Sequence, residues 1–328
     1  METRGLLERA VANAAAVRRS TSPNPWVGAV VVTADGRTFD GATEPPGGRH
    51  AEIVALDAAR AAGADLAGAS IVVTLEPCRH QGRTGPCTDA LLGAGIARCT
   101  VGVLDPDPNV AGRGVEQLRT AGVAIDVLDA APVADQLAPY LHHRRTGRPY
   151  VVLKLASTLD GRTAAPDGSS RWITGPEARA DVHRLRADSD AVLVGAGTVR
   201  ADDPELTVRD ADGPDPLRVV LGRAPEGAKV HPCLELGGDL GDVLDTLGGK
   251  GVLQLLVEGG PTVAGALHRQ GLVDRYVLYL APALLGGEDA RPVLAGPAAA
   301  TIADAWRGRI ESIARLGADL RIELVGGQ

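Results

Sequence analysis

Residues 74–87 read TLEPCRHQGRTGPC, and residues 50–52 upstream read HAE. Together these two stretches supply one histidine, His50, and two cysteines, Cys78 and Cys87. In a reducing cytosol disulfides are disfavoured, so closely spaced cysteines indicate a metal site or catalysis. Each of the three residues adjoins a segment with a regular hydrophobic pattern, which predicts that secondary structure holds them in place.

The three side chains make the ligand set of a catalytic zinc site. Three protein ligands leave the fourth position of a tetrahedral zinc ion open, and the ion lowers the pKa of a water in that position. Such a site can replace an amine on an amidine-like ring carbon by oxygen, if a non-ligand carboxylate moves the protons. Glu52 follows His50 by two residues, and we assign it that role. A buried histidine beside two core cysteines, or a structural zinc with His80 as a fourth ligand, are the alternatives.

Strand and helix patterns alternate around these residues. In the first half we expect strands over 27–32, 71–75, 100–104 and 123–128, and helices over 1–20, 50–62, 86–93, 114–121 and 133–145. This alternation predicts an α/β/α sandwich with a largely parallel sheet.

The second half repeats the alternation after a polar stretch. Residues 142–149, HHRRTGRP, end in Gly and Pro, which is typical of a boundary, so we expect domains 1–147 and 148–328. Beyond the boundary we expect strands over 150–156, 191–195, 217–221, 252–257 and 275–281, helices over 176–186 and 261–270, and a strand-like 320–325. No element is assigned to Gly222–Gly241.

The composition is that of a globular enzyme rather than a membrane or nucleic-acid protein. The 328 residues carry a formal net charge of -7 with 2% aromatics, so neither a basic surface nor stacking platforms for nucleic acid are expected. No apolar run approaches the roughly 20 residues of a membrane helix, and we expect a cytoplasmic protein. The remaining cysteines, Cys99 and Cys233, are interpreted as small apolar core residues.

Stretch 74–87 closely resembles the riboflavin-biosynthesis deaminases. The usual zinc-deaminase signature has two residues between its cysteines, whereas eight separate them here and in that family. Residues 22–30, SPNPWVGAV, resemble the family's first loop and strand. The resemblance implies a cytidine-deaminase-like fold, with Asn24 on the base and His80 closing over the substrate. Thr43 stands where the family usually has a histidine, so contacts on that side are open.

Four segments of the second half carry its chemistry. They are 154–162 (KLASTLDGR), 169–175 (SSRWITG), 194–204 (VGAGTVRADDP) and 257–266 (VEGGPTVAGA). The last two are strand–Gly–helix junctions, where small residues let a phosphate approach N–H groups at a helix N-terminus. Their spacing is not the usual dinucleotide fingerprint, and for each junction alone tight packing is an adequate alternative.

Taken together, the four segments resemble the reductase half of the same bifunctional family, which has a dihydrofolate-reductase-like fold. The resemblance implies that NADPH is held by Ser157, Trp172, Thr198, Asp202, Gly260, Pro261, Thr262, Val263, Ala264, Gly265 and Ala266. It places the substrate on Lys154, Ser170, Arg186, Leu206, Arg209 and Glu258. Arg186 and Arg209 suit a phosphate because a guanidinium binds its oxygens in bidentate fashion, although either could equally be a solvated surface residue.

The family resemblance implies a bifunctional enzyme with zinc and NADPH as cofactors. The first domain would remove the 2-amino group of 2,5-diamino-6-ribosylamino-4(3H)-pyrimidinone 5′-phosphate, and the second would reduce the ribosyl group to ribityl. The alternatives are a zinc deaminase of another base or nucleoside with a non-catalytic assembly domain, and a non-catalytic zinc module. A homo-oligomer, dimer or tetramer, is also implied, with the apolar strand 276–280 as a candidate interface. The interval Gly222–Gly241 is shorter than in the family, which would trim a cofactor-contacting element.

Overall fold

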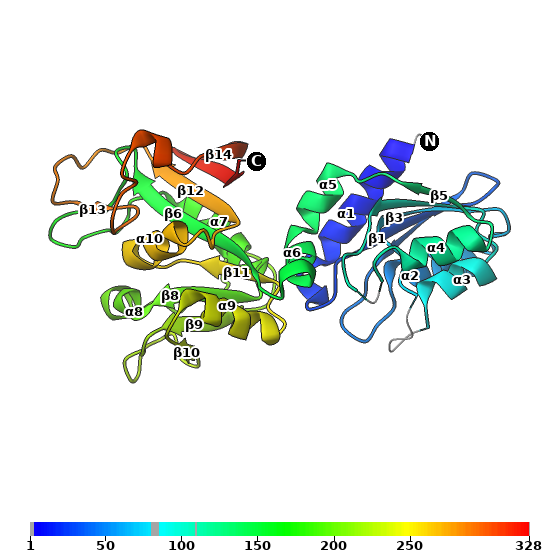
Figure 1. The fold of residues 1–328 in the computed structure, drawn as a ribbon, viewed down its shortest axis with the longest axis horizontal. Helices are drawn as coiled ribbons and strands as arrows, with labels where there is room; N and C mark the ends of the chain where they lie inside the picture. The colour runs from blue at the N-terminus through cyan, green and yellow to red at the C-terminus, as the bar shows by residue number, and fades with distance from the viewer. Residues whose placement is uncertain (1–2, 80–84, 109, 328) are drawn as a thin grey trace. The chain divides into compact units, whose positions relative to one another are not determined.

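The computed structural model describes residues 3–79, 85–108 and 110–327. The chain divides into two compact units, Met1–Gly147 and Arg148–Gln328 (Figure 1). Across the described ranges, none of the helices combines the length and the apolar character that crossing a membrane requires.

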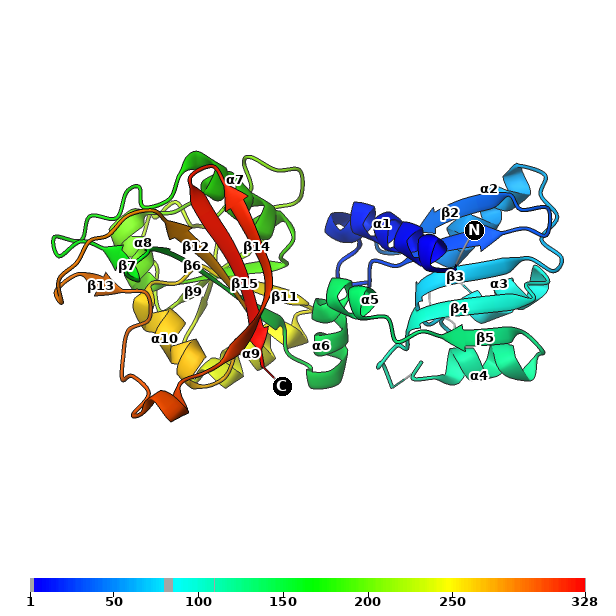
Figure 2. The same ribbon diagram turned by 90° about the horizontal axis from the view of Figure 1, so that it is seen from above.

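The first unit is built on a five-stranded sheet in the order β2-β1-β3-β4-β5 (Figure 2). Its elements are α1 (Thr3–Thr21), β1 (Gly28–Val32), β2 (Thr38–Ala42), α2 (Ala51–Ala61), β3 (Ser70–Leu75), α3 (Cys87–Gly93), β4 (Arg98–Val103), α4 (Arg113–Thr120), β5 (Ala124–Val127), α5 (Ala131–Gln136) and α6 (Ala138–Thr146).

Two glycines show how closely helices cover both faces of this sheet. A Cβ on Gly28 would lie 1.9 Å from the carbonyl oxygen of Ala10 in α1, and a Cβ on Gly41 would lie 2.0 Å from that of Ala51 in α2. Gly41 pairs with Ala29, the neighbour of Gly28, and successive residues of a strand face opposite sides. Helices α1 and α2 therefore pack on opposite faces, and the predicted α/β/α sandwich is confirmed.

The direction of the strands differs from the prediction of a largely parallel sheet. Strands β3, β4 and β5 are parallel neighbours, but β1 is antiparallel to both β2 and β3. Half of the pairings are thus antiparallel, because a hydrophobic pattern fixes which residues face the core but not which way a strand runs. The predicted helix 133–145 is two helices, α5 and α6, because Pro139 starts a new helix instead of continuing the first.

The second unit contains an eight-stranded sheet in the order β10-β9-β8-β11-β6-β12-β15-β14. Its elements are β6 (Tyr150–Thr158), β7 (Arg162–Ala164), α7 (Pro176–Ala187), β8 (Ala191–Gly195), α8 (Ala196–Asp202), β9 (Leu217–Leu221), β10 (Leu234–Leu236), α9 (Leu240–Gly249), β11 (Gln254–Val257), α10 (Pro261–Arg269), β12 (Arg275–Ala281), β13 (Arg291–Pro292), the 3-10 turn Ile302–Asp304, β14 (Gly308–Leu316) and β15 (Asp319–Gly326). The run from β10 to β12 is parallel, and β15 and β14 add two antiparallel strands.

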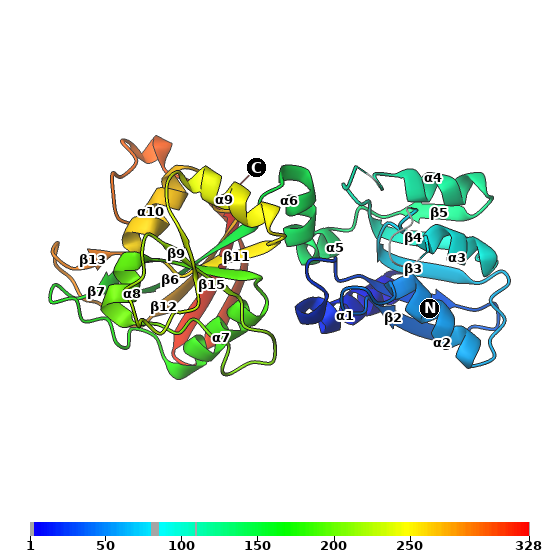
Figure 3. The same cartoon turned by 90° about the horizontal axis from the view of Figure 1, so that it is seen from below.

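The core of the second unit lies in two layers, one on each face of the sheet. Side chains of α9 and α10, among them Leu244, Leu247 and Leu267, pack on one face. Side chains of α7 and α8, among them Val182 and Val199, pack on the other. Figure 3 shows α9 and α10 on one side of the sheet and α7 on the opposite side.

The strand 276–280, the unassigned interval Gly222–Gly241 and the two remaining cysteines can be compared with the structure. Strand 276–280, a candidate oligomer interface, belongs to β12, whose two edges are hydrogen-bonded to β6 and β15. It is therefore a central strand that cannot pair with a second copy along its edge, and its part in an interface stays a prediction. The unassigned interval Gly222–Gly241 contains β10 and the start of α9. Cys99 is buried as predicted, whereas Cys233 is only partly buried.

Candidate functional site

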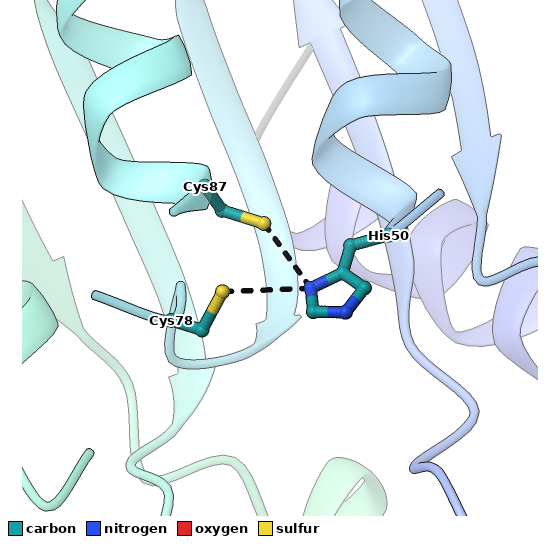
Figure 4. Close-up of side chains that lie close together, drawn as sticks. All are labelled: His50, Cys78 and Cys87. Carbon is teal, nitrogen blue, oxygen red and sulfur yellow. Dashed lines mark hydrogen bonds between the residues drawn. The ribbon is translucent and has the colours of Figure 1, made fainter. Parts of the chain in front are cut away.

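The predicted zinc ligands converge at the ends of three elements of the first unit. His50 is the residue before α2, Cys87 is the first residue of α3, and Cys78 follows β3. Nδ1 of His50 lies 3.5 Å from Sγ of Cys78 and 3.3 Å from Sγ of Cys87. Figure 4 shows the imidazole and the two sulfur atoms pointing toward one another.

The spacing of these donors fits zinc. Bonds of about 2.0–2.1 Å to nitrogen and about 2.3 Å to sulfur, at tetrahedral angles, place the two atoms about 3.6 Å apart. The three ligand atoms all lie within 4.8 Å of one another. One nitrogen and two sulfurs leave a fourth position for a small molecule, as a catalytic site requires.

The cysteine pair favours the charge state that binds a metal. A hydrogen bond from Cys87, together with one from His50, lowers the pKa of Cys78 to about 4, against the opposing effect of burial. The same bond between the sulfurs raises the pKa of Cys87. This arrangement favours the thiolate form of Cys78, and a thiolate is the form that ligates metals.

Glu52 is placed for proton transfer beside the ligands. It lies in the first turn of α2 and is only 3% exposed. Burial first, and then the charge of Cys78, raise the pKa of its carboxyl group to about 7. A carboxyl group that titrates near neutral pH can both accept and return a proton.

Glu76, in the same stretch as Cys78, has a supporting role in the site that the sequence did not predict. Its buried carboxylate accepts backbone N–H bonds from Asp105 (3.3 Å), Gly112 (2.9 Å), Gly114 (2.9 Å) and Val115 (3.1 Å). These bonds tie the loop that carries Cys78 to the start of α4. The available signal was a glutamate directly before a Pro-Cys pair, but its partners are backbone groups, which no residue pattern marks.

The other predicted residues of this unit lie in different settings. Asn24 is half-buried in the turn between α1 and β1, where its N–H donates to the carbonyl of Thr21 at 2.8 Å. Thr43 is 4% exposed, and its hydroxyl accepts a bond from the N–H of Val27 at 3.1 Å, so it serves the fold. His80 lies outside the described residues.

In the second unit, Arg186 of α7 and Glu258 after β11 form a bidentate pair. Nε of Arg186 donates to Oε1 of Glu258 at 2.6 Å and Nη2 donates to Oε2 at 3.0 Å. Lys154 of β6 is close enough to interact electrostatically with both, and burial lowers the pKa of its ammonium group. Interaction with Arg186 and Lys154 outweighs burial and lowers the pKa of Glu258. The sheet thus brings these three predicted substrate residues together.

The loop after α8 is held to α7 by hydrogen bonds. The carbonyl of Thr207 accepts a bond from Nη1 of Arg186 at 3.0 Å, and the N–H of Arg209 contacts Nδ1 of His183 at 3.3 Å. The predicted substrate residue Leu206 is buried at a positive φ of 57°. The guanidinium of Arg209 is largely exposed and pairs with Glu205 at 2.6 Å.

Three of the four segments singled out for NADPH are joined by direct bonds. The N–H of Gly260 donates to Oγ1 of Thr198 at 3.2 Å, which links the two strand–Gly–helix junctions. Nη2 of Arg171 donates to the carbonyl of Asp202 at 2.9 Å, which links the segment 169–175 to the first junction. Trp172 is 70% exposed, with the Arg179 guanidinium 4.5 Å from its ring centre, and Arg179 was not predicted.

The N-terminus of α10 fits a nucleotide phosphate. Gly260 is its N-cap residue, Pro261 begins the helix, and no side chain caps it. The predicted residues Thr262, Val263, Ala264, Gly265 and Ala266 form its first turns. Uncapped N–H groups and the positive end of the helix dipole attract an anion. Of the remaining predicted residues, Ser157 is buried on β6 and Ser170 is partly exposed in the loop before α7.

Family models match both units. Residues 2–103 match the cytidine and deoxycytidylate deaminase zinc-binding region, and residues 149–321 match the RibD C-terminal domain. The chain is 44% identical to the riboflavin biosynthesis protein RibD of Mycobacterium tuberculosis, over 94% of this chain and 93% of the relative. It is 38% identical to RibD of Escherichia coli K12, over 99% and 100%.

Solved structures agree along nearly the whole chain. RibD of Acinetobacter baumannii superposes with a TM-score of 0.91 at 36% identity, covering 99% of both chains. A Thermotoga maritima protein described as a diaminohydroxyphosphoribosylaminopyrimidine deaminase and 5-amino-6-(5-phosphoribosylamino)uracil reductase superposes with a TM-score of 0.88 at 32% identity, covering 98% of both. Since both units match and relatives of 38–44% identity align along nearly the whole chain, this chain belongs to the RibD family of riboflavin biosynthesis proteins.

Proposed function

We propose that this chain catalyses two successive steps of riboflavin synthesis. The first is hydrolytic removal of the 2-amino group of 2,5-diamino-6-ribosylamino-4(3H)-pyrimidinone 5′-phosphate, and the second is NADPH-dependent reduction of the ribosyl group to ribityl. The observation that carries the proposal is the convergence of His50, Cys78 and Cys87 beside the buried carboxyl group of Glu52. We assign deamination to residues 1–147 and reduction to residues 148–328.

In the deaminase step Glu52 transfers the protons. A bound zinc ion supplies a Lewis acid that makes water nucleophilic at neutral pH. Glu52 accepts a proton from the attacking water and passes it to the ring nitrogen. It then delivers a proton to the amino group that leaves as ammonia, so that water and a C–NH2 group become a carbonyl and ammonia. Its burial beside the ligands favours the protonated form more than solvent does, which helps it to return the proton as well as to accept it.

Asn24 and His80 are proposed to hold the pyrimidine in this step. Thr43 is engaged with the backbone of Val27, so we propose no substrate contact for it. Substrate contacts that a histidine at this position would make in relatives must then come from other residues in this chain.

In the reductase step the protein binds and orients two ligands, and NADPH supplies the hydride. We propose that a phosphate of NADPH lies at the N-terminus of α10, over residues 260–266, with Ser157, Thr198 and Asp202 lining the same site. Trp172 is proposed to stack on the cofactor, because its ring is 70% exposed. These residues bind and position the cofactor, and none is assigned an acid or base role.

For the substrate of the reductase we propose contacts from Lys154, Ser170, Leu206, Arg209 and Glu258. Arg209 has an exposed guanidinium that can exchange Glu205 for a phosphate. Arg186 has a different proposed role. Its guanidinium N–H groups already donate to Glu258 and to the carbonyl of Thr207. We therefore propose that Arg186 positions Glu258 instead of binding phosphate.

A homo-oligomer, dimer or tetramer, is part of the proposal. Strand β14 lies at an edge of the eight-stranded sheet and exposes Ile310 (53%) and Ile313 (61%). An open edge with apolar side chains pairs readily with a second copy. Sedimentation of Ile313→Lys, which we expect to be more dissociated than the unchanged chain, tests this part.

The experiment that tests the function records two signals from the purified full chain and the pyrimidinone phosphate. Ammonia release reports deamination, and loss of NADPH absorbance reports reduction. Both signals are expected, and chelation of zinc should stop both because the second step needs the product of the first. Ammonia without NADPH oxidation would favour a deaminase with a non-catalytic second unit. Neither signal would overturn the substrate assignment.

A further inference from the structure

A second group of metal-binding side chains lies in the connection from β9 to α9, apart from both sites above. His231, Cys233 and Glu235 offer donor atoms that all lie within 4.8 Å of one another. In the described part of the chain, it and the cluster around His50 are the two groups of three His, Cys or carboxylate residues with this spacing.

The three residues lie within β10 and in the segment directly before it. Glu235 is the middle residue of β10, Cys233 directly precedes the strand, and His231 lies on the other side of the bend at Pro232. The intervening Leu234 and the following Leu236 pack against the core layer under α9 and α10. Glu235 lies between these two leucines on the strand, so it faces away from that layer. It and His231 are exposed to solvent, whereas Cys233 is partly buried against the core layer under α7 and α8.

The imidazole of His231 is oriented as a ligand. Its Nε2 lies 3.1 Å from the carbonyl oxygen of Pro225, and because a carbonyl only accepts, Nε2 carries the hydrogen. In the neutral ring Nδ1 then has a free lone pair, and Nδ1 lies 3.6 Å from Sγ of Cys233. A backbone carbonyl that fixes the ring in this way is the usual outer partner of a metal-bound histidine.

The geometry repeats that of the first cluster. There too Nδ1 faces sulfur, at 3.5 Å and 3.3 Å, and a tetrahedral zinc ion requires about 3.6 Å between nitrogen and sulfur. The third donor, Glu235, is also held, since its Oε1 accepts the N–H of Ala224 at 2.9 Å. Arg218 is the neighbouring cation, and its Nη1 is directed to the carbonyl of His231 at 3.3 Å rather than to the donors.

We propose that His231, Cys233 and Glu235 bind a second zinc ion, with water in the fourth position. Nitrogen, sulfur and carboxylate donors together suit zinc better than magnesium or calcium, which take oxygen ligands. The ion would clamp the turn at Ala224 and Pro225 to β10, because both of these residues bond to the ligands. Binding releases the thiol proton of Cys233. The proposal is independent of the two catalytic activities.

Zinc stoichiometry of the full chain tests the proposal. After equilibration with buffered zinc and removal of free metal, elemental analysis should give two zinc ions per chain, of which the second is lost first on titration with a chelator because its ligands are more exposed. His231→Ala and Cys233→Ser should each reduce the content to one ion while ammonia release and NADPH oxidation persist. The matched control Glu226→Gln changes an exposed carboxylate of the same connection between β9 and α9, and it should keep two zinc ions per chain.

One zinc ion per unchanged chain would overturn the proposal, and so would two ions in both variants. Cobalt gives a second, spectroscopic readout of the same site. The second equivalent of Co²⁺ should add a thiolate-to-cobalt charge-transfer band in the unchanged chain. Cys233→Ser should keep the band of the first equivalent and lack the addition, whereas an unchanged second addition would exclude Cys233 as a ligand.

Discussion

Arg186 and Glu258, 72 residues apart in sequence, face each other through two parallel hydrogen bonds of 2.6 Å and 3.0 Å. Their side chains are 11% and 8% exposed. Removing one partner of a buried ion pair leaves an uncompensated charge, which costs more than the pair itself contributes. The pair therefore fixes where Glu258 points at the end of β11.

Replacement of Arg186 by Met tests this relationship. The variant should lose about 3–5 kcal/mol in the free energy of unfolding of the second unit, and NADPH oxidation should fall while ammonia release continues. Urea denaturation and the two-signal assay measure the two effects. Arg209→Met is the control for stability alone, since Arg209 is itself proposed to bind substrate; it breaks the exposed pair with Glu205 and should cost under about 1 kcal/mol. Equal losses of the free energy of unfolding in the two variants would mean that burial of the Arg186–Glu258 pair is unimportant.

Replacement of Glu52 by Gln tests the proton-transfer role. Because the amide cannot carry protons, ammonia release should fall by about 10²–10⁴-fold or more, while zinc content and NADPH oxidation of supplied deaminated intermediate stay unchanged. Ammonia kinetics and elemental analysis measure this. Glu8→Gln, an exposed glutamate of α1, is the control. Retained ammonia release with full zinc would assign the proton transfer to another group.

The sequence predicted the zinc ligands because their signals are local. His50, Cys78 and Cys87 each stand close to the end of a recognisable strand or helix, and the structure brings their donor atoms within 4.8 Å of one another. Glu76 could not be found in the same way, since its four partners are backbone N–H groups 29 to 39 residues further along the chain. Every residue except proline has a backbone N–H group, so the identity of the partner residues gives no signal of these hydrogen bonds.

Sheet order and strand direction were also beyond the sequence. The run 276–280 has the same apolar character whether a strand lies at an edge or in the middle, and only pairing of β12 with both β6 and β15 decides between them. Arg186 shows a similar limit for side chains. Its type predicted a phosphate ligand, whereas the fold supplies Glu258 as its partner.

Replacement of Glu76 by Gln tests the anchor of the Cys78 loop. One carboxylate oxygen becomes an NH2 group that faces two N–H donors, so the variant should lose about 2 kcal/mol or more. Zinc content at limiting zinc should fall with it, because Cys78 follows this residue by two positions. Thermal unfolding and elemental analysis measure the effects. Glu116→Gln, on the exposed face of α4, should change neither, and full stability of Glu76→Gln would show that the four bonds are dispensable.

Replacement of Gly28 by Ala tests the contact between α1 and the sheet. The added Cβ would lie 1.9 Å from the carbonyl oxygen of Ala10, a backbone atom that cannot move without shifting α1. Overpacking of this kind costs about 1–3 kcal/mol, so the thermal midpoint of the first unit should fall. Gly93→Ala is the control, because nothing lies within 4 Å of a Cβ there and the residue ends helix α3. Alanine is the better helix former by about 1 kcal/mol, so this control should be neutral or more stable. If both variants fell equally, loss of glycine itself would be responsible, and α1 would not be held against β1 by close backbone contact.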